Sequence, residues 1–169
     1  MEKERFQECS EGCSQISKGD EVKMSYTTIR TLRGLLKTSG QRKTLVVDDG
    51  RLNHGHRITS IRMWPARASE VGDISATLAT DGIAATIPMD ASNNGQIGWV
   101  YAAFGTSPGN GFEFILDPNH IVVTELVIVA NFGASFASGV NYMITLEPIM
   151  LTDSESAVVQ IKARQQNLV

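Results

Sequence analysis

Short apolar runs separated by turn residues restrict the possible folds of this sequence more than any other feature. Between Lys43 and Glu147 glycine, asparagine, aspartate or proline separates seven runs, at Lys43–Val47, His56–Trp64, Ile74–Thr80, Ile97–Ala103, Phe112–Leu116, His120–Ala130 and Val140–Glu147. Such runs predict short strands, and none precedes the long helical pattern of a parallel α/β fold. We expect a mainly β protein, an antiparallel β-sandwich or jelly roll.

Two of these runs predict the centre of the core. His120–Ala130 is apolar on both faces apart from Thr124 and Glu125, so we expect a long central strand covered on both sides. Val140–Glu147 alternates apolar with polar residues, as a half-buried strand does. The predicted core residues are Val122, Leu126, Ile128, Tyr142, Ile144 and Leu146.

The two ends of the chain differ from this body. Residues 1–43 are polar and basic and are expected to form an extended arm, with Thr28–Leu36 either a short helix or extended; residues 44–151 form the body. Residues 152–169 are predicted to form a helix, capped by Thr152, Asp153 or Ser154 with Glu155 in its first turn. Its apolar stripe is expected to pack on the body or on a partner, and consists of Ala157, Val158, Ile161 and Leu168.

Charge is distributed unevenly along the chain. Val22–Lys43 carries six Lys or Arg residues and no acid, whereas Ala68–Ile161 carries ten Asp or Glu residues and no Lys or Arg. A basic arm beside an acidic body can be a solvated segment or can dock on an acidic surface of a subunit or of nucleic acid. Tyr26 is the only aromatic residue in the basic stretch, so protein is favoured over nucleic acid. The candidate interface residues are Arg30, Arg33, Lys37, Arg42, Lys43 and Arg51.

The residues needed for catalysis or for a metal do not form a recognisable set. His54 and His56 near Asp48 and Asp49 are possible metal ligands, although a turn with two histidines needs no metal. Asp90, Asn93 and Asn94 lack the spacing and terminal Glu of a calcium loop. Two cysteines, Cys9 and Cys13, are too few for a four-cysteine zinc site and are expected to be ordinary thiols. We therefore expect a protein that is not an enzyme and that holds no metal or cofactor.

Two further features have alternative interpretations. Trp64, Trp99 and Tyr101 are candidates for a sugar site, but Trp99 and Tyr101 share a strand face, and core positions are favoured for them. Asp48-Asp49-Gly50-Arg51 predicts a turn in which Gly50 takes a positive φ. Arg51 there is either solvated or reaches an acidic neighbour at a subunit contact.

Three segments carry a resemblance to a known family: Leu45–Pro65 (LVVDDGRLNHGHRITSIRMWP), Ile115–Ala130 (ILDPNHIVVTELVIVA) and Val140–Asn167 (VNYMITLEPIMLTDSESAVVQIKARQQN). Together they resemble small virion structural proteins of marine tailed bacteriophages. The resemblance covers somewhat more than a third of the chain and leaves out the segment before Tyr26 and the parts of Gly105–Gly139 that flank Ile115–Ala130.

This resemblance implies a place in a virus particle. With the charge pattern, it leads us to expect a head or capsid accessory subunit, a decoration or minor capsid protein, that binds copies of itself and other virion proteins. The alternative is a tail or surface module that binds host glycan. Since no apolar run approaches the roughly 20 residues of a membrane helix, we expect no membrane partner.

Overall fold

The computed structural model describes residues 29–51, 53–82, 84–85, 89–105 and 112–166, the last five by their backbone alone. Within these ranges, eight strands are followed by one helix. In chain order they are β1 (Arg30–Leu36), β2 (Arg42–Val46), β3 (His54–Pro65), β4 (Gly72–Ala79), β5 (Gln96–Phe104), β6 (Phe112–Leu116), β7 (Glu125–Phe132), β8 (Val140–Met150) and α1 (Asp153–Gln166). No helix among these residues is long and apolar enough to span a membrane.

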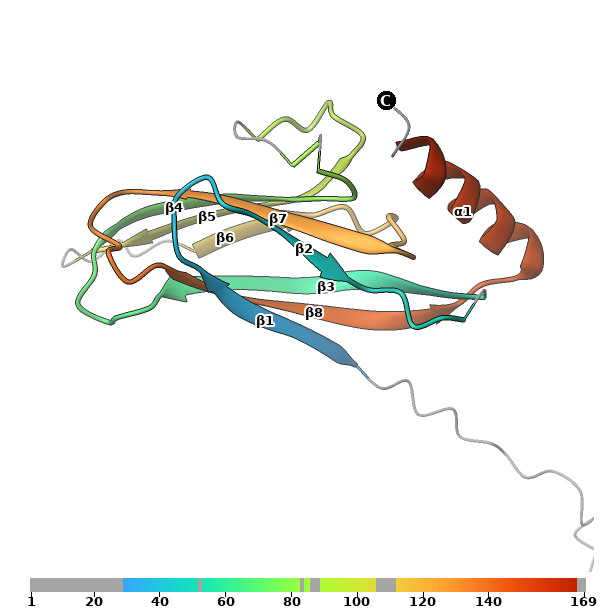
Figure 1. Cartoon of the computed structure of the whole chain (residues 1–169), viewed down its shortest axis with the longest axis horizontal. Coiled ribbons are helices and arrows are strands. Elements are labelled where there is room, and N and C mark those ends of the chain that lie inside the picture. The colour runs from blue at the N-terminus through green and yellow to red at the C-terminus, as the bar shows by residue number, and fades with distance from the viewer. Residues whose placement is uncertain (1–28, 52, 83, 86–88, 106–111, 167–169) are drawn as a thin grey trace, which may run out of the picture.

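The strands form two antiparallel sheets arranged as two layers (Figure 1). One sheet has the order β1-β8-β3, and the other has the order β2-β7-β4-β5-β6. Among the described strands, β6 pairs only with β5, so the sheets are not joined into a closed barrel. The predicted mainly β class with a short C-terminal helix is confirmed.

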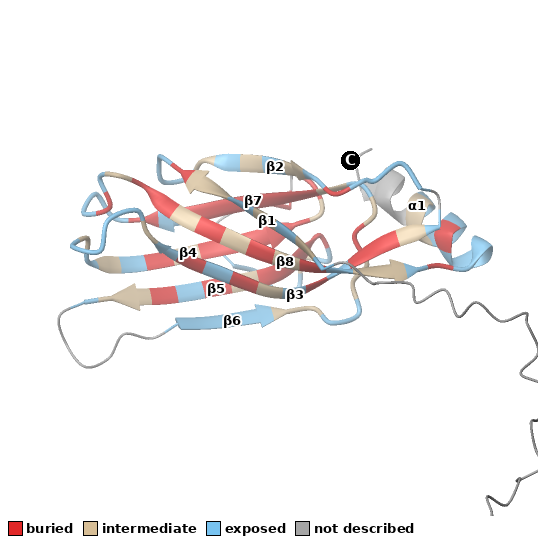
Figure 2. Cartoon of the chain, turned by 90° about the horizontal axis from the view of Figure 1, so that it is seen from below, coloured by how far each residue is buried: buried red, intermediate tan, exposed pale blue. Residues whose placement is uncertain are grey.

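Side chains from both sheets share one hydrophobic core, and buried residues alternate along several strands (Figure 2). All six predicted core residues are confirmed, because each is at most 2% exposed. The alternation arises because successive side chains of a strand point to opposite faces, so Tyr142, Ile144 and Leu146 all face the other layer.

The central position predicted for strand β7 is correct, but the residue predicted to begin it is not. It lies inside its sheet, and both its faces are covered: Val127 and Val129 pack in a second cluster with Ala84 and Ala85. The predicted start at His120 is wrong, and the longest strand is β3, with 12 residues. Before Glu125 the chain forms a turn and a single bridge between Val122 and His56. The segment that precedes β7 is therefore apolar because it is partly buried, although it forms no continuous ladder with a neighbouring strand.

Residues 30–43, assigned above to the arm, belong largely to the sheets. Strand β1 pairs with β8, and β2 pairs with β7. Leu32 and Leu36 face the core, while Arg33 between them faces outward. Gly34 lies so close to β8 that an added Cβ would stand 2.5 Å from the Tyr142 Oη. The body therefore begins by Arg30. The strand pattern of this segment is hard to recognise in the sequence because basic residues occupy some of its outward positions.

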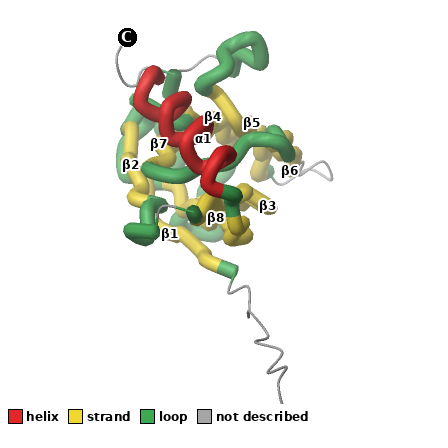
Figure 3. Tube along the Cα trace, turned by 90° about the vertical axis from the view of Figure 1, so that its right-hand side faces the viewer, coloured by secondary structure: helices red, strands yellow, loops and turns green. Residues whose placement is uncertain are grey.

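Helix α1 lies across one end of the two layers (Figure 3). Its first turn is a capping box: the Glu155 N–H donates to Thr152 Oγ1 at 3.4 Å, and the Thr152 N–H donates to Glu155 Oε2 at 2.9 Å. Thr152 is thus the cap among the three candidates. Val158 and Ile161 of the predicted stripe are 52% and 56% exposed, so they do not pack on the body. Leu168 lies outside the described residues.

Candidate subunit interface

Two of the six candidate interface cations have partners inside the chain. The Arg30 guanidinium donates hydrogen bonds to the carbonyl oxygens of Val47, at 2.7 Å, and Val46, at 3.1 Å. It therefore ties β1 to the end of β2 in the other sheet. The ammonium of Lys43 lies 5.5 Å from the centroid of the Tyr142 ring, within the range of a cation–π contact.

The other four cations are exposed but do not gather in one patch. Arg33 lies on the outer face of the three-stranded sheet, and Arg42 lies on the outer face of the five-stranded sheet. Lys37 is in the turn after β1, and Arg51 is in the turn before β3. The structure therefore does not bring the six residues together as one surface, and their role in a subunit contact stays a prediction.

A basic face emerges instead on the three-stranded sheet. Arg33 of β1 and Arg62 of β3 are both the direct partners of Met143 on β8, which lies between them. Arg57 is exposed on the same face, and so is Trp64, at 40%. The guanidinium groups of Arg33, Arg57 and Arg62 make no hydrogen bond or ion pair within the described part of the chain.

Sequence reasoning missed Arg57 and Arg62. The basic stretch of the sequence ends at Lys43, yet the run His56–Trp64 places Arg57 and Arg62 at solvent-facing positions beside the buried residues Ile58, Ile61 and Met63. An irregularity between Ile58 and Ser60 shifts the alternation by one residue, which hides that both arginines face the same side.

The outer face of the five-stranded sheet has the opposite sign. Glu113 of β6 is the direct partner of Tyr101 on β5, and Asp73 of β4 is the partner of Ala103 two residues further along β5. Both carboxylates are exposed and unpaired within the described residues, and Tyr101 is 46% exposed. Glu125 of β7 lies on the same face. Residues distant in sequence thus form an acidic surface.

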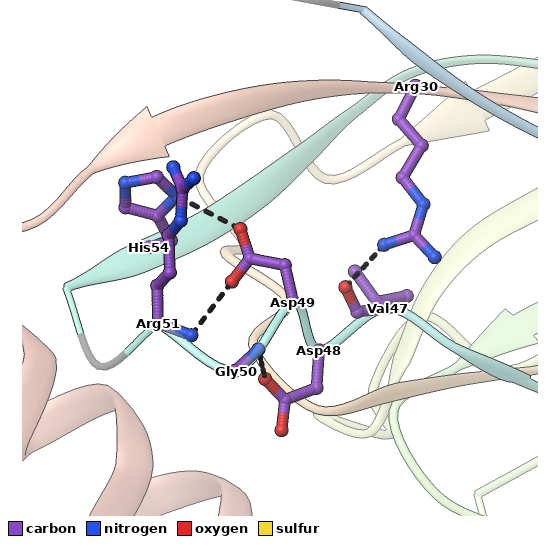
Figure 4. Close-up of polar contacts among 7 residues, drawn as sticks. All are labelled: Arg30, Val47, Asp48, Asp49, Gly50, Arg51 and His54. Atoms are coloured by element: carbon purple, nitrogen blue, oxygen red, sulfur yellow. Dashed lines mark hydrogen bonds and ion pairs between the residues drawn. The ribbon is translucent and has the colours of Figure 1, made fainter.

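The turn between β2 and β3 is held by its own carboxylates (Figure 4). Asp48 Oδ1 accepts a hydrogen bond from the Gly50 N–H, Asp49 Oδ1 accepts one from the Arg51 N–H, and Asp49 Oδ2 lies 3.0 Å from His54 Nδ1. Gly50 has φ +77°, as predicted. Partial burial opposes ionisation of Asp49, but its bonds to Arg51 and His54 outweigh burial and lower its pKa.

This turn borders a cleft of about 210 Å³ against helix α1. Its lining includes Arg51, His54, Thr124 and Gln160. The described residues contain no group of three or more His, Cys, Asp or Glu side chains placed to hold a metal. In the loop compared above with a calcium site, Asp90 Oδ1 accepts hydrogen bonds from Ser92, and Asn93 Oδ1 accepts one from the Gly95 N–H. Those oxygens therefore fix a local turn.

The three candidate sugar-binding aromatics are divided between the two outer faces. Trp64 is on the three-stranded sheet, whereas Trp99 and Tyr101 are on the five-stranded sheet. The prediction that Trp99 and Tyr101 lie in the core is wrong, since Val100 and Ala102 occupy the inward positions of β5. The half-buried Trp99 donates its indole N–H to Gln96 Oε1 at 2.8 Å.

A comparison of the chain with protein-family models, curated proteins and solved structures found no match.

Proposed function

We propose that this chain is a structural subunit of a bacteriophage particle, a decoration or minor capsid protein of the head, built as a jelly-roll sandwich. It acts by binding copies of itself and other virion proteins. The proposal includes no catalytic role. The observation that carries it is the order in which the strands pair.

An eight-stranded jelly roll wraps so that its first strand pairs with its last, its second with its seventh, its third with its sixth and its fourth with its fifth. Two further ladders join strand eight to strand three and strand seven to strand four. Five of these six ladders are present here: β1·β8, β2·β7, β4·β5, β3·β8 and β4·β7. The sixth is replaced by a ladder between β5 and β6.

Viral capsid domains use the jelly roll, as do lectins and cupins, so the fold alone does not choose among them. Two observations support the capsid role. The first is the resemblance of Leu45–Pro65, Ile115–Ala130 and Val140–Asn167 to phage virion proteins. The second is the pair of outer faces with unpaired charges of opposite sign, which suits repeated subunit contacts.

Glycan binding remains the second candidate because Tyr101 is exposed beside the half-buried Trp99. Aromatic side chains on a sheet face can stack on sugar rings. A glycan array with the full chain, repeated with Tyr101→Ala, tests this candidate. Binding that disappears in the variant favours it over the capsid role.

The capsid role is tested on purified particles of the phage that encodes the chain. We expect mass spectrometry to detect the chain at a fixed stoichiometry to the major head protein, and an electron-microscopy map to place it on the head. Absence from the particles, or location in the tail alone, overturns the proposal.

A further inference from the structure

The two outer faces of the molecule are opposite in formal charge. The described outward positions of β1, β8 and β3 carry Arg33, Arg57 and Arg62 against Glu147, which gives three cations and one anion. Those of the five-stranded sheet carry Asp73, Glu113 and Glu125 against Arg42, which gives three anions and one cation. The formal charges are therefore +2 (3 − 1) and −2 (1 − 3) on opposite sides of one chain.

The unpaired charges are also spaced similarly on the two faces. Arg33 and Arg62 lie on strands separated only by β8, and Asp73 and Glu113 lie on strands separated only by β5. Neighbouring strands are about 4.8 Å apart, so the arginines, which share one register row, are about 10 Å apart. The carboxylates are also offset by two residues along β5, about 7 Å, so they are about 12 Å apart. Between the arginines lies half-buried Met143, and beside the carboxylates lies exposed Tyr101.

We infer that the basic face of one copy docks on the acidic face of a second copy, so that subunits associate head to tail. Arg33 and Arg62 bind the carboxylates of Asp73 and Glu113, and Met143 packs on the ring of Tyr101. Arginine, methionine and aromatic residues are the types enriched at interfaces, and methionine sulfur packs well on aromatic rings. This inference rests on the proposed self-association and names the surfaces that carry it.

A head-to-tail contact uses two different surfaces, so it leaves a free face at each end and continues into rings or chains. It is therefore distinguishable from a two-fold contact. Removing either face alone stops self-association, but a copy with only its acidic face can still bind a copy with only its basic face.

The experiment is sedimentation velocity on the full chain at about 50 mM and about 500 mM salt, where screening differs strongly. The basic-face variant is Arg33→Gln/Arg62→Gln, and the acidic-face variant is Asp73→Asn/Glu113→Gln. We expect the unmodified chain to form species larger than a dimer at low salt. Each variant should associate at least about tenfold more weakly, and an equimolar mixture of both variants should stop at a dimer.

The matched control is Lys37→Gln/Arg67→Gln, which removes two positive charges from exposed turns outside both faces and should not weaken association. The inference is overturned if the unmodified chain stays monomeric at low salt, or if the mixture forms no dimer. It is also overturned if a DNA oligonucleotide binds the monomer through Arg33 and Arg62, which would assign the basic face to nucleic acid. None of these outcomes changes whether the chain is found in particles, so the proposed function is judged separately.

Discussion

At the scale of single residues, His56 is held in an environment that disfavours its charged form. Its side chain is 5% exposed, and its Nδ1 has no hydrogen-bond partner among the described residues. Burial is the main cause that lowers its pKa below the ordinary 6.5, and the charges of Arg30 and His54 act in the same direction. Asp49 opposes them without reversing the shift.

The lowered pKa of His56 predicts a loss of stability in mild acid. As the pH falls below 6.5, the unfolded chain takes up a proton that the folded chain does not, so the free energy of unfolding falls until the folded pKa is reached. Melting temperatures measured from pH 7.5 to pH 5 should therefore fall less steeply for His56→Gln than for the unmodified chain. Equal slopes for His56→Gln and the unmodified chain would show that His56 titrates normally.

Truncation of Leu126 on β7 tests how strongly the shared core stabilises the fold. It is fully buried between the sheets, so Leu126→Ala should lower the free energy of unfolding by about 2–5 kcal/mol through lost burial and a residual cavity. Val46 on the neighbouring strand β2 is 66% exposed, and Val46→Ala should cost less than about 0.5 kcal/mol. Denaturant titration of both variants measures the difference. Similar costs would be incompatible with the described packing of β7.

At the scale of elements, the capping box of α1 is the feature most open to a direct test. Because Thr152 both donates to and accepts from Glu155, Thr152→Ala should fray the first turn of the helix. The Thr152 hydrogen bonds also lower the pKa of Glu155. Backbone amide exchange near Ser154–Ser156 should quicken, while exchange in β7 and β8 stays unchanged. Thr145→Ala, an equal truncation on β8, should leave the helix amides protected.

The elements found from the sequence are those bounded by turn residues. Six of the predicted runs overlap β2, β3, β4, β5, β6 and β8 closely, because turn residues mark where each run ends. The sequence does not decide between helix and extended chain for β1, because Arg33 at an outward position and Arg30 at its start resemble a solvated arm. The start of β7 was placed too early because burial makes a bridge segment as apolar as a strand.

The candidate surface was predicted less well than the strands. The charge asymmetry was visible in the sequence, but the residues that share a face depend on which strands are neighbours. Arg33 and Arg62 are 29 positions apart in the sequence, and they share a face only because both of their strands pair with β8. Asp73 and Glu113 likewise share a face only through β5. Local patterns carry no information on such pairings.

At the scale of the whole molecule, the boundary of the body predicts where the chain tolerates truncation. The first ladder of the fold begins at Arg30, so deleting residues 1–28 should leave a chain that unfolds cooperatively near the same denaturant concentration as the full chain. Deleting residues 1–43 removes all of β1 and the start of β2, including the buried Leu36. That chain should show no cooperative transition in circular dichroism. If it folds as well as the shorter deletion, β1 does not contribute to the three-stranded sheet.

The central place of β8 has a consequence for the order of events during translation. It is the last of the described strands in chain order, yet it lies between β1 and β3, so the three-stranded sheet cannot form until residue 150 has left the ribosome. Until then, no ladder fixes the distance between the strands that carry Arg33 and Arg62. The basic face is therefore completed only when β8 joins the sheet, and only chains synthesised past β8 can bind one another through it.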